Sequence, residues 1–416
     1  MNNRFFAVFV CALGLGLGYA PVFMSTLPTL LKPMAEAFGW SRTEAASGIA
    51  VATLFLSLGM PLVGRLVDRF GVRPVVIVST TLFGTMLFVL SRLQGSTPLY
   101  LAAAAVLGFS AVGTTPLTYM TVLAKRFDAR LGTAMGVAML GMGIGYAAMP
   151  LLAARWSQSL GWRDAFVGLA GLAAIAVVNA VFFVREPRLA AGAQAQAAAA
   201  SLELPGMSLR EALRTRVLWL LAGGAFLVSL AIAGTAVHLV SLMSDRGYAI
   251  SDAATAGALM GVSVLVARFL TGILLDRLPV TRIAAVAFAG GGAGIVMLWS
   301  GGGGFVPFLA AFCMGVASGA EGDILPFACR RYFGMRAYGQ IYGLVTAFFG
   351  LGAVVGPVLL GLAFDRSGSY STMLLVFAAL CGCAALASLA LGRPRYGRLE
   401  EAPAAPPFAS LNPVNK

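Results

Sequence analysis

Long apolar runs alternate with short polar segments along almost the whole chain. Twelve of these runs approach or exceed the length that a helix needs to cross a bilayer core, about 20 apolar residues. They cover residues 5–31, 45–63, 74–92, 97–124, 131–154, 163–184, 217–243, 251–275, 281–300, 304–328, 338–363 and 370–392. Several contain interior glycine or proline, which membrane helices tolerate. The pattern predicts an all-α integral membrane protein with twelve transmembrane helices.

The composition supports this prediction. The chain of 416 residues is 59% hydrophobic and only 11% charged, which is too little charge for a soluble protein of this length. The five cysteines lie in or at the ends of apolar runs, without the neighbours that a metal site would need. We interpret them as small packing residues and predict neither a metal ion nor a cofactor.

The two halves of the chain repeat each other. Three residues of one turn recur 208 positions later: Gly64, Asp68 and Arg69 reappear as Gly272, Asp276 and Arg277. The spacing is half the chain, so we expect two pseudo-symmetric bundles of six helices each. Many transporters are built from such repeats, with the substrate site between the halves.

The domain boundaries follow from one break in the pattern. Residues 1–184 form the expected N-terminal six-helix bundle, and residues 217–394 form the C-terminal one. The segment 185–216 is too polar to span and is the expected cytoplasmic linker, with a short amphipathic helix near 208–215. The Pro/Ala-rich tail 395–416 is expected to be disordered and cytoplasmic.

The net charge of +13 reflects topology. Most Lys and Arg residues lie in the termini, the linker and the loops on the linker side, which is the positive-inside pattern. We therefore expect both termini in the cytoplasm and the protein in the inner (plasma) membrane. The partner that this charge indicates is the lipid bilayer, not nucleic acid, and we expect a monomer.

The segment between the second and third runs carries a specific motif. The stretch from Gly64 to Pro74, GRLVDRFGVRP, closely resembles the signature loop of the major facilitator superfamily. The resemblance implies the major facilitator fold. It also implies that Asp68 contacts a neighbouring helix end and locks one conformation, a role in gating that we extend to Gly64, Arg69, Asp276 and Arg277. The alternative is a basic loop that serves topology alone.

Shorter patches resemble one branch of that superfamily, the monocarboxylate transporters and oxalate/formate antiporters. They are FGWSR at 38–42, AKRF at 124–127, RLGTAMG at 130–136, and Arg268 four residues before Gly272. The resemblance implies a small organic acid as substrate, bound through its carboxylate by Arg268.

Three charged side chains lie deep in the predicted spans: Arg268, Glu321 and Asp323. Such residues usually line a pathway or pair with one another, because a charge at the bilayer centre costs roughly 2.5–3.5 kcal/mol on insertion scales. A guanidinium presents a planar fork that matches a carboxylate. Arg268 is therefore the candidate substrate ligand, and a structural ion pair with Glu321 is the alternative.

Glu321 and Asp323 are two residues apart, so they point to opposite sides of one helix. Glu321 and Arg268 lie equally far along two spans that run in the same direction, so we expect Glu321 to pair with Arg268 and to carry the coupled proton. A purely structural Glu321 is the alternative. Asp323 is expected to cap or pack near the inner gate, although it is also a candidate for proton coupling.

The remaining polar candidates for substrate contact are single residues within spans: Tyr19, Thr114, Thr115, Tyr119 and His238. His238 is the only histidine and can either relay protons or form a neutral hydrogen bond. The tyrosines and threonines are either cavity contacts or bonded only to their neighbours.

Two differences from the branch limit the range of possible substrates. The oxalate exchangers pair the arginine with a Lys in the helix that corresponds to run 338–363, and this run has no Lys. The monocarboxylate transporters often have an Asp four residues before the arginine, and here that position is Val264. One buried positive charge favours a monoanion. We therefore predict a secondary transporter, not an enzyme, that carries a small organic monocarboxylate by proton-coupled symport and alternating access, most simply inward. The alternatives are a proton-coupled exporter of drugs or amphipathic compounds, and an organic anion exchanger.

Overall fold

The computed structural model describes residues 4–127, 130–184 and 205–396. This part of the chain contains 12 helices that are long and apolar enough to cross a membrane. The prediction of an all-helical, twelve-span protein is therefore confirmed. The expected linker falls outside the described residues over 185–204, and the expected tail falls outside them from residue 397 onward.

Six spans come from each half of the chain. The first half contains α1 (Arg4–Gly16), η1 (Ala20–Met24), α2 (Leu27–Phe38), α3 (Arg42–Phe70), α4 (Val72–Ser91), α5 (Thr97–Ser110), η2 (Ala111–Thr114), α6 (Pro116–Arg126), α7 (Leu131–Leu160) and α8 (Trp162–Phe183). The second half contains α11 (Arg216–Ser244), α12 (Ile250–Leu275), α13 (Val280–Trp299), α14 (Val306–Phe333), α15 (Tyr338–Ser367) and α16 (Ser371–Leu389). A short linker helix, α10 (Leu209–Leu213), precedes α11.

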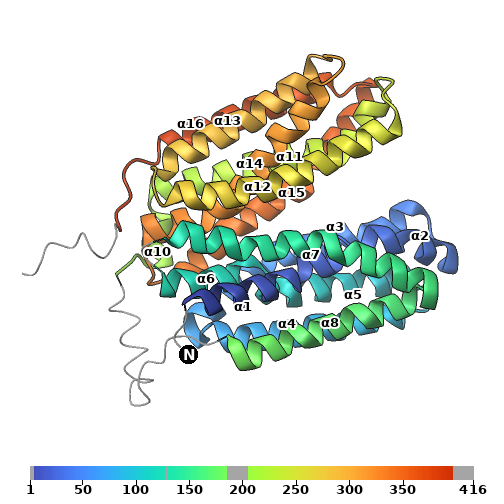
Figure 1. Cartoon of the computed structure of the whole chain (residues 1–416), viewed down its shortest axis with the longest axis horizontal. Helices are drawn as coiled ribbons and strands as arrows, with labels where there is room; N and C mark the ends of the chain where they lie inside the picture. Colours follow the sequence, from blue (N-terminus) through green and yellow to red (C-terminus); the bar gives the residue numbers. More distant parts are fainter. Residues whose placement is uncertain (1–3, 128–129, 185–204, 397–416) are drawn as a thin grey trace, which may run out of the picture.

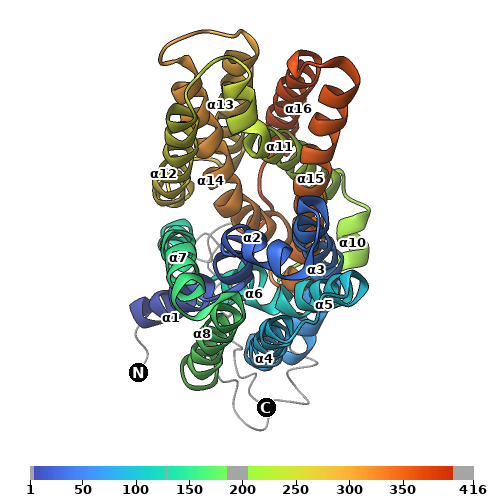
Figure 2. The same ribbon diagram turned by 90° about the vertical axis from the view of Figure 1, so that its right-hand side faces the viewer.

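The halves form two lobes that face each other (Figure 2). Helices α12, α14 and α15 of the second half lie toward the first half, whereas α13 and α16 lie at the far edge of their lobe. Helices α4 and α8 occupy the corresponding far edge of the first half. The third and sixth spans of each half are therefore peripheral, and the remaining spans position any site between the lobes.

The lobes meet at the end that carries α10 and diverge toward the opposite end (Figure 1). The closest approach joins α3 to α15, where a Cβ added at Gly64 would lie 2.1 Å from the carbonyl oxygen of Gly339. On the other side, a Cβ at Gly132 of α7 would lie 2.4 Å from the Gly272 carbonyl oxygen of α12. Only glycine allows backbones this close. The molecule is closed on the linker side.

An aromatic cluster packs the open end of the first half. Phe38 ends α2 and Trp40 follows it. The Phe38 ring lies 5.3 Å from that of Trp162, and the Trp40 ring lies 4.9 Å from that of Tyr100. The guanidinium of Arg163 lies 4.3 Å from the Trp162 ring centre and donates to the Leu93 carbonyl oxygen at 3.1 Å. The patch at 38–42 thus meets residues 162–163, far away in sequence, in one cluster of this lobe.

Two spans of the first half are broken near their middle. A five-residue π-helix, η1, interrupts the first span, and a 3-10 turn, η2, interrupts the fourth. The breaks touch, because the Tyr19 backbone N–H donates to the Thr114 hydroxyl at 3.0 Å. Irregular backbone at membrane depth needs such partners, since lipid offers none. Discontinuous helices of this kind often border transporter binding sites.

Candidate functional site

Arg268 lies on the face of α12 that packs against α7 and α14. The residue is only 8% exposed, and its Nη1 lies 3.9 Å from Oδ1 of Asp323 on α14. This distance makes an ion pair but exceeds a hydrogen bond. Nη1 of Arg268 and both carboxylate oxygens of Asp323 have no hydrogen-bond partner among the described residues. The pair is therefore buried, loose and incompletely satisfied.

A glycine makes room for this guanidinium. A Cβ added at Gly322 would lie 2.6 Å from Nη1 of Arg268. Gly322 stands between the two carboxylates of α14, and its missing side chain is what lets Arg268 lie against that helix.

The expected pairing of Arg268 with Glu321 is wrong, because Asp323 is the carboxylate that lies beside Arg268. Glu321 is 1% exposed and faces the opposite way, close enough to Cys381 of α16 for an electrostatic interaction. Among the described residues its Oε1 has no hydrogen-bond partner. The two carboxylates do point to opposite sides of α14, but Asp323 is the one that faces α12.

Two tyrosines near Arg268 were not singled out from the sequence. Tyr146 of α7 and Tyr342 of α15 both lie close enough to Arg268 to interact with its charge. Tyr146 is 39% exposed and contacts Met24 of η1 through its hydroxyl at 3.8 Å. Tyr146 comes from the first half, so it gives the site a polar group on the lobe opposite Arg268. The sequence signal that could have identified Tyr146 is its position near the middle of a span that consists mostly of small residues.

The other polar candidates form no hydrogen bond or ion pair with Arg268 among the described residues, although Tyr19 lies close enough to Tyr146 to interact with it electrostatically. Tyr19 places its hydroxyl 3.2 Å from that of Thr53, and Thr114 and Thr115 donate to carbonyls within their own broken span, each at 2.7 Å. Tyr119 is fully buried, and its hydroxyl has no partner among the described residues. Tyr19, Thr114 and Thr115 thus bond at the two helix breaks, whereas Tyr119 packs against Gly14 of α1.

His238 lies elsewhere in the second half. Its Nε2 is 3.0 Å from the Pro357 carbonyl oxygen on α15, and its ring centre is 5.7 Å from that of Tyr370. This contact joins α11 to α15 and to the start of α16. The structure does not bring His238 together with Arg268 or Asp323.

The repeated motif residues contact the starts of two helices in the opposite half. Asp68 accepts the backbone N–H groups of Gly339 and Gln340 at 2.8 Å each, at the first turn of α15. Asp276 accepts those of Gly132 and Thr133 at 2.8 Å each, at the first turn of α7. Both carboxylates satisfy free N–H groups and complement the helix dipole. Arg69 and Arg277 are exposed beside them.

The change of Asp68 to Asn tests the contribution of this contact to closure. Asn keeps the size but loses the charge, so two charge-assisted hydrogen bonds weaken by about 1–3 kcal/mol in total. We expect the equilibrium between the closed and open linker side to shift by roughly 10–100-fold toward the open form. Electron-spin distance measurements between labels at the inner ends of α3 and α15 would report the shift.

The matched change on the same helix is Arg65 to Gln. Arg65 is an exposed basic residue three positions before Asp68. We expect this variant to keep the wild-type distance distribution. Equal distributions for the Asp68 variant and the wild type would show that the contact does not hold the lobes together.

Comparison with known proteins supports the architecture. The chain matches the Major Facilitator Superfamily over residues 5–328. It is 27% identical to human "Monocarboxylate transporter 11" over 88% of this chain and 78% of that protein. It is also 27% identical to the "Nitrite extrusion protein" of Bacillus subtilis (strain 168), over 80% of each chain. The structure of the human organic anion transporter MFSD10 superposes with a TM-score of 0.73 at 18% identity, covering 93% of this chain and 99% of that one.

The superfamily match covers more than half of the chain, and the structural match spans nearly all of it. The structural match agrees with the overall fold described above. The family consists of membrane transporters and not of enzymes. The chain is therefore a member of the major facilitator superfamily, a multi-pass secondary transporter of a small substrate.

Proposed function

We propose that the protein carries a small organic monocarboxylate together with a proton, and that Arg268 binds the carboxylate. The observation that carries this proposal is the loose ion pair between Arg268 and Asp323, 3.9 Å apart and buried between α12 and α14. A tight structural pair would satisfy its polar atoms, because a desolvated charge is costly otherwise. Here Nη1 and both Asp323 oxygens remain available to a ligand and a proton.

The charges at this site couple the two cargoes. Without substrate, the positive guanidinium and the negative Asp323 balance each other. A substrate carboxylate that approaches Arg268 adds a second negative charge, and protonation of Asp323 restores the balance. The loaded site is then neutral, as the empty one is, and both states avoid an unpaired charge in the membrane. Asp323, and not Glu321, is the proton carrier in this proposal.

Alternating access follows from the arrangement of the lobes. The structure is closed where Asp68 and Asp276 meet α15 and α7, and the lobes diverge at the far end. The basic loops lie on the closed side, so we assign that side to the cytoplasm and both termini with it. Release would require the two carboxylate contacts to break while the lobes close at the other end.

An uptake experiment in proteoliposomes tests the proposal. We expect a small monocarboxylate to accumulate above its equilibrium level when the lumen is alkaline, and to equilibrate without accumulation when the pH gradient is collapsed. Dicarboxylates and neutral analogues of the same size should not accumulate. Accumulation that persists without a pH gradient, or that requires a counter-anion in the lumen, would contradict proton symport.

An anion exchanger is the second candidate. The available basic group in the site is a single guanidinium, and a guanidinium also binds small inorganic monoanions. One relative is named for nitrite extrusion. Nitrite in the same uptake assay, with and without a preloaded anion, separates exchange of an inorganic anion from symport of an organic one.

A further inference from the structure

The linker helix leaves a basic cavity at the end of the second half. The cavity is a depression open to the surface, with a volume of about 460 Å³, and it lies between α10 and the start of α15. Its lining residues are Ser208, Leu209, Arg210, Leu213, Arg336, Ala337 and Gln340. Two of them are arginines, and the carboxylate groups nearby belong to α10 and the gate, not to the lining. The electrostatics of the cavity therefore favour an anion.

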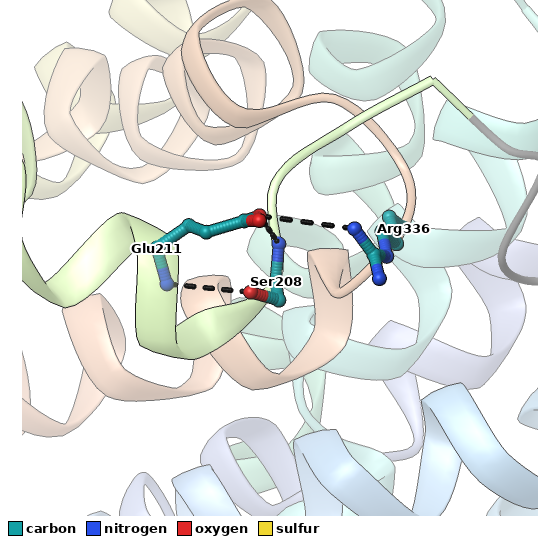
Figure 3. Close-up of polar contacts among 3 residues, drawn as sticks. All are labelled: Ser208, Glu211 and Arg336. Atoms are coloured by element: carbon teal, nitrogen blue, oxygen red, sulfur yellow. Dashed lines mark hydrogen bonds and ion pairs between the residues drawn. The ribbon is translucent and has the colours of Figure 1, made fainter.

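The linker is fixed to the second half around this cavity. The Met207 N–H donates to the Phe333 carbonyl oxygen at 2.8 Å, and the Met335 N–H donates to that of Pro205 at 3.0 Å. Ser208 and Glu211 form a capping box that starts α10, and Oε2 of Glu211 lies 3.8 Å from Nη1 of Arg336 (Figure 3). The walls of the cavity are thus held in place by backbone and side-chain contacts.

Glu211 lies outside the lining of the cavity and offsets part of the charge of Arg336. Hydrogen bonds from the backbone N–H and then the hydroxyl of Ser208 hold the pKa of Glu211 below its usual range, so the carboxylate is charged and engages Arg336 from one side. Arg210 is exposed. An anion in the cavity would meet Arg210 and share Arg336 with Glu211.

The cavity lies beside the starts of two membrane spans, α11 at Arg216 and α15 at Tyr338. Trp219 is 50% exposed and donates from its indole N–H to the Leu213 carbonyl oxygen at 2.9 Å. Leu213 is itself 38% exposed and lines the cavity. Tryptophan is favoured at the headgroup level, where one side of the ring meets lipid tails.

We propose that this cavity binds the phosphate headgroup of an anionic phospholipid, with Arg210 and Arg336 as its ligands and Leu213 and Trp219 beside the acyl chains. Guanidinium groups match phosphate oxygens in geometry and charge. Basic cavities beside membrane helices are a known arrangement for such headgroups. A lipid bound there would lie beside the gate, because Gln340 lines the cavity and its backbone N–H donates to Asp68.

Native mass spectrometry of the purified full chain tests the site. Phosphatidylglycerol would be titrated into the detergent-solubilised protein, and phosphatidylcholine would serve as the zwitterionic comparison. We expect a resolved first phosphatidylglycerol site that phosphatidylcholine does not fill. The double variant R210Q/R336Q should weaken that site roughly 30-fold, from about 1 kcal/mol for each basic residue near the surface.

Two matched variants separate the cavity from general charge and from folding. R214Q/R216Q removes the same charge from the same segment but leaves the lining intact, so we expect less than about a threefold loss. E211Q breaks the pair with Arg336 but retains the capping box and both arginines, so binding should stay equal or tighten. Size-exclusion profiles and melting points of all variants would establish that they fold.

Three results would overturn the proposal. The first is an equal loss in the control double variant and in R210Q/R336Q, and the second is equal binding of the two lipids. The third is displacement of phosphatidylglycerol by millimolar inorganic phosphate, which would make the cavity a site for a soluble anion and not for a lipid.

Discussion

Transport by the variant Arg268→Lys should fall by at least about 30-fold in kcat/KM for the monocarboxylate. Lysine keeps the positive charge but cannot form the two parallel hydrogen bonds of a guanidinium, and losing one charge-assisted bond removes about 2 kcal/mol. The ammonium also reaches less far toward the space that Gly322 opens beside Nη1. Initial uptake rates over a range of substrate concentrations would measure the loss.

The control for this variant is Arg282→Lys. Arg282 is an exposed residue on α13, at the periphery of the second lobe. The same chemical change there should leave uptake within the error of the assay. Wild-type kinetics in Arg268→Lys would contradict carboxylate binding by the guanidinium, whereas a rise in KM without a change in kcat would indicate binding that is equal in the ground and transition states.

Asp323→Asn is expected to abolish proton coupling while substrate exchange continues. Asparagine cannot take up the proton that balances the substrate charge, so proton-driven accumulation should be lost. Exchange of labelled for unlabelled substrate at equal concentrations requires no net proton movement and should survive, although more slowly. The measurements are accumulation with an alkaline lumen and counterflow without a gradient, in the same proteoliposome preparation.

Glu321→Gln is the matched comparison, on the same helix two residues away. Glu321 faces Cys381 and not Arg268, so we expect this variant to retain accumulation, provided that the isosteric amide is accommodated among α14 and α16. Surviving counterflow in Asp323→Asn also shows that the variant folds despite the unpaired Arg268. If Glu321→Gln loses accumulation and Asp323→Asn retains it, Glu321 and not Asp323 carries the proton.

The pattern of apolar runs and the repeat were sufficient to predict the architecture. Twelve spans follow from length and hydropathy alone, since lipid requires about 20 apolar residues for each helix. The depth of Arg268 could also be predicted from the sequence, because a span that begins near residue 251 places residue 268 well inside the membrane. Motif residues such as Asp68 were identified because the loop around them resembles the signature loop of the superfamily.

The ion-pair partner of Arg268 could not be predicted from the sequence in the same way. Glu321 and Asp323 differ in depth by only about 3 Å along a helix, so depth does not separate them. What separates them is the rotation of α14 about its own axis, which is set by packing against α12 and α13. A helix whose sides are all apolar or small carries little periodic signal for that rotation.

The helix breaks were also missed. The runs that contain η1 and η2 are continuous in hydropathy, and their Pro and Gly residues resemble those of the unbroken α7 and α15. Whether a proline bends a span or interrupts it depends on neighbours that can satisfy the freed backbone groups. Here the Tyr19 N–H and the Thr114 hydroxyl satisfy each other across two spans, a tertiary contact that no single run records.

The gate contacts have a consequence for how this family can diverge. Asp68 and Asp276 bond to backbone N–H groups at four positions, and every residue except proline supplies that group. A change at Gln340 or Thr133 therefore keeps the backbone bond, although a change of Thr133 also loses the bond that its hydroxyl donates to Asp276 at 2.7 Å. Because backbone groups make most of this contact, methods that infer contacts from correlated substitutions would detect the closure only weakly.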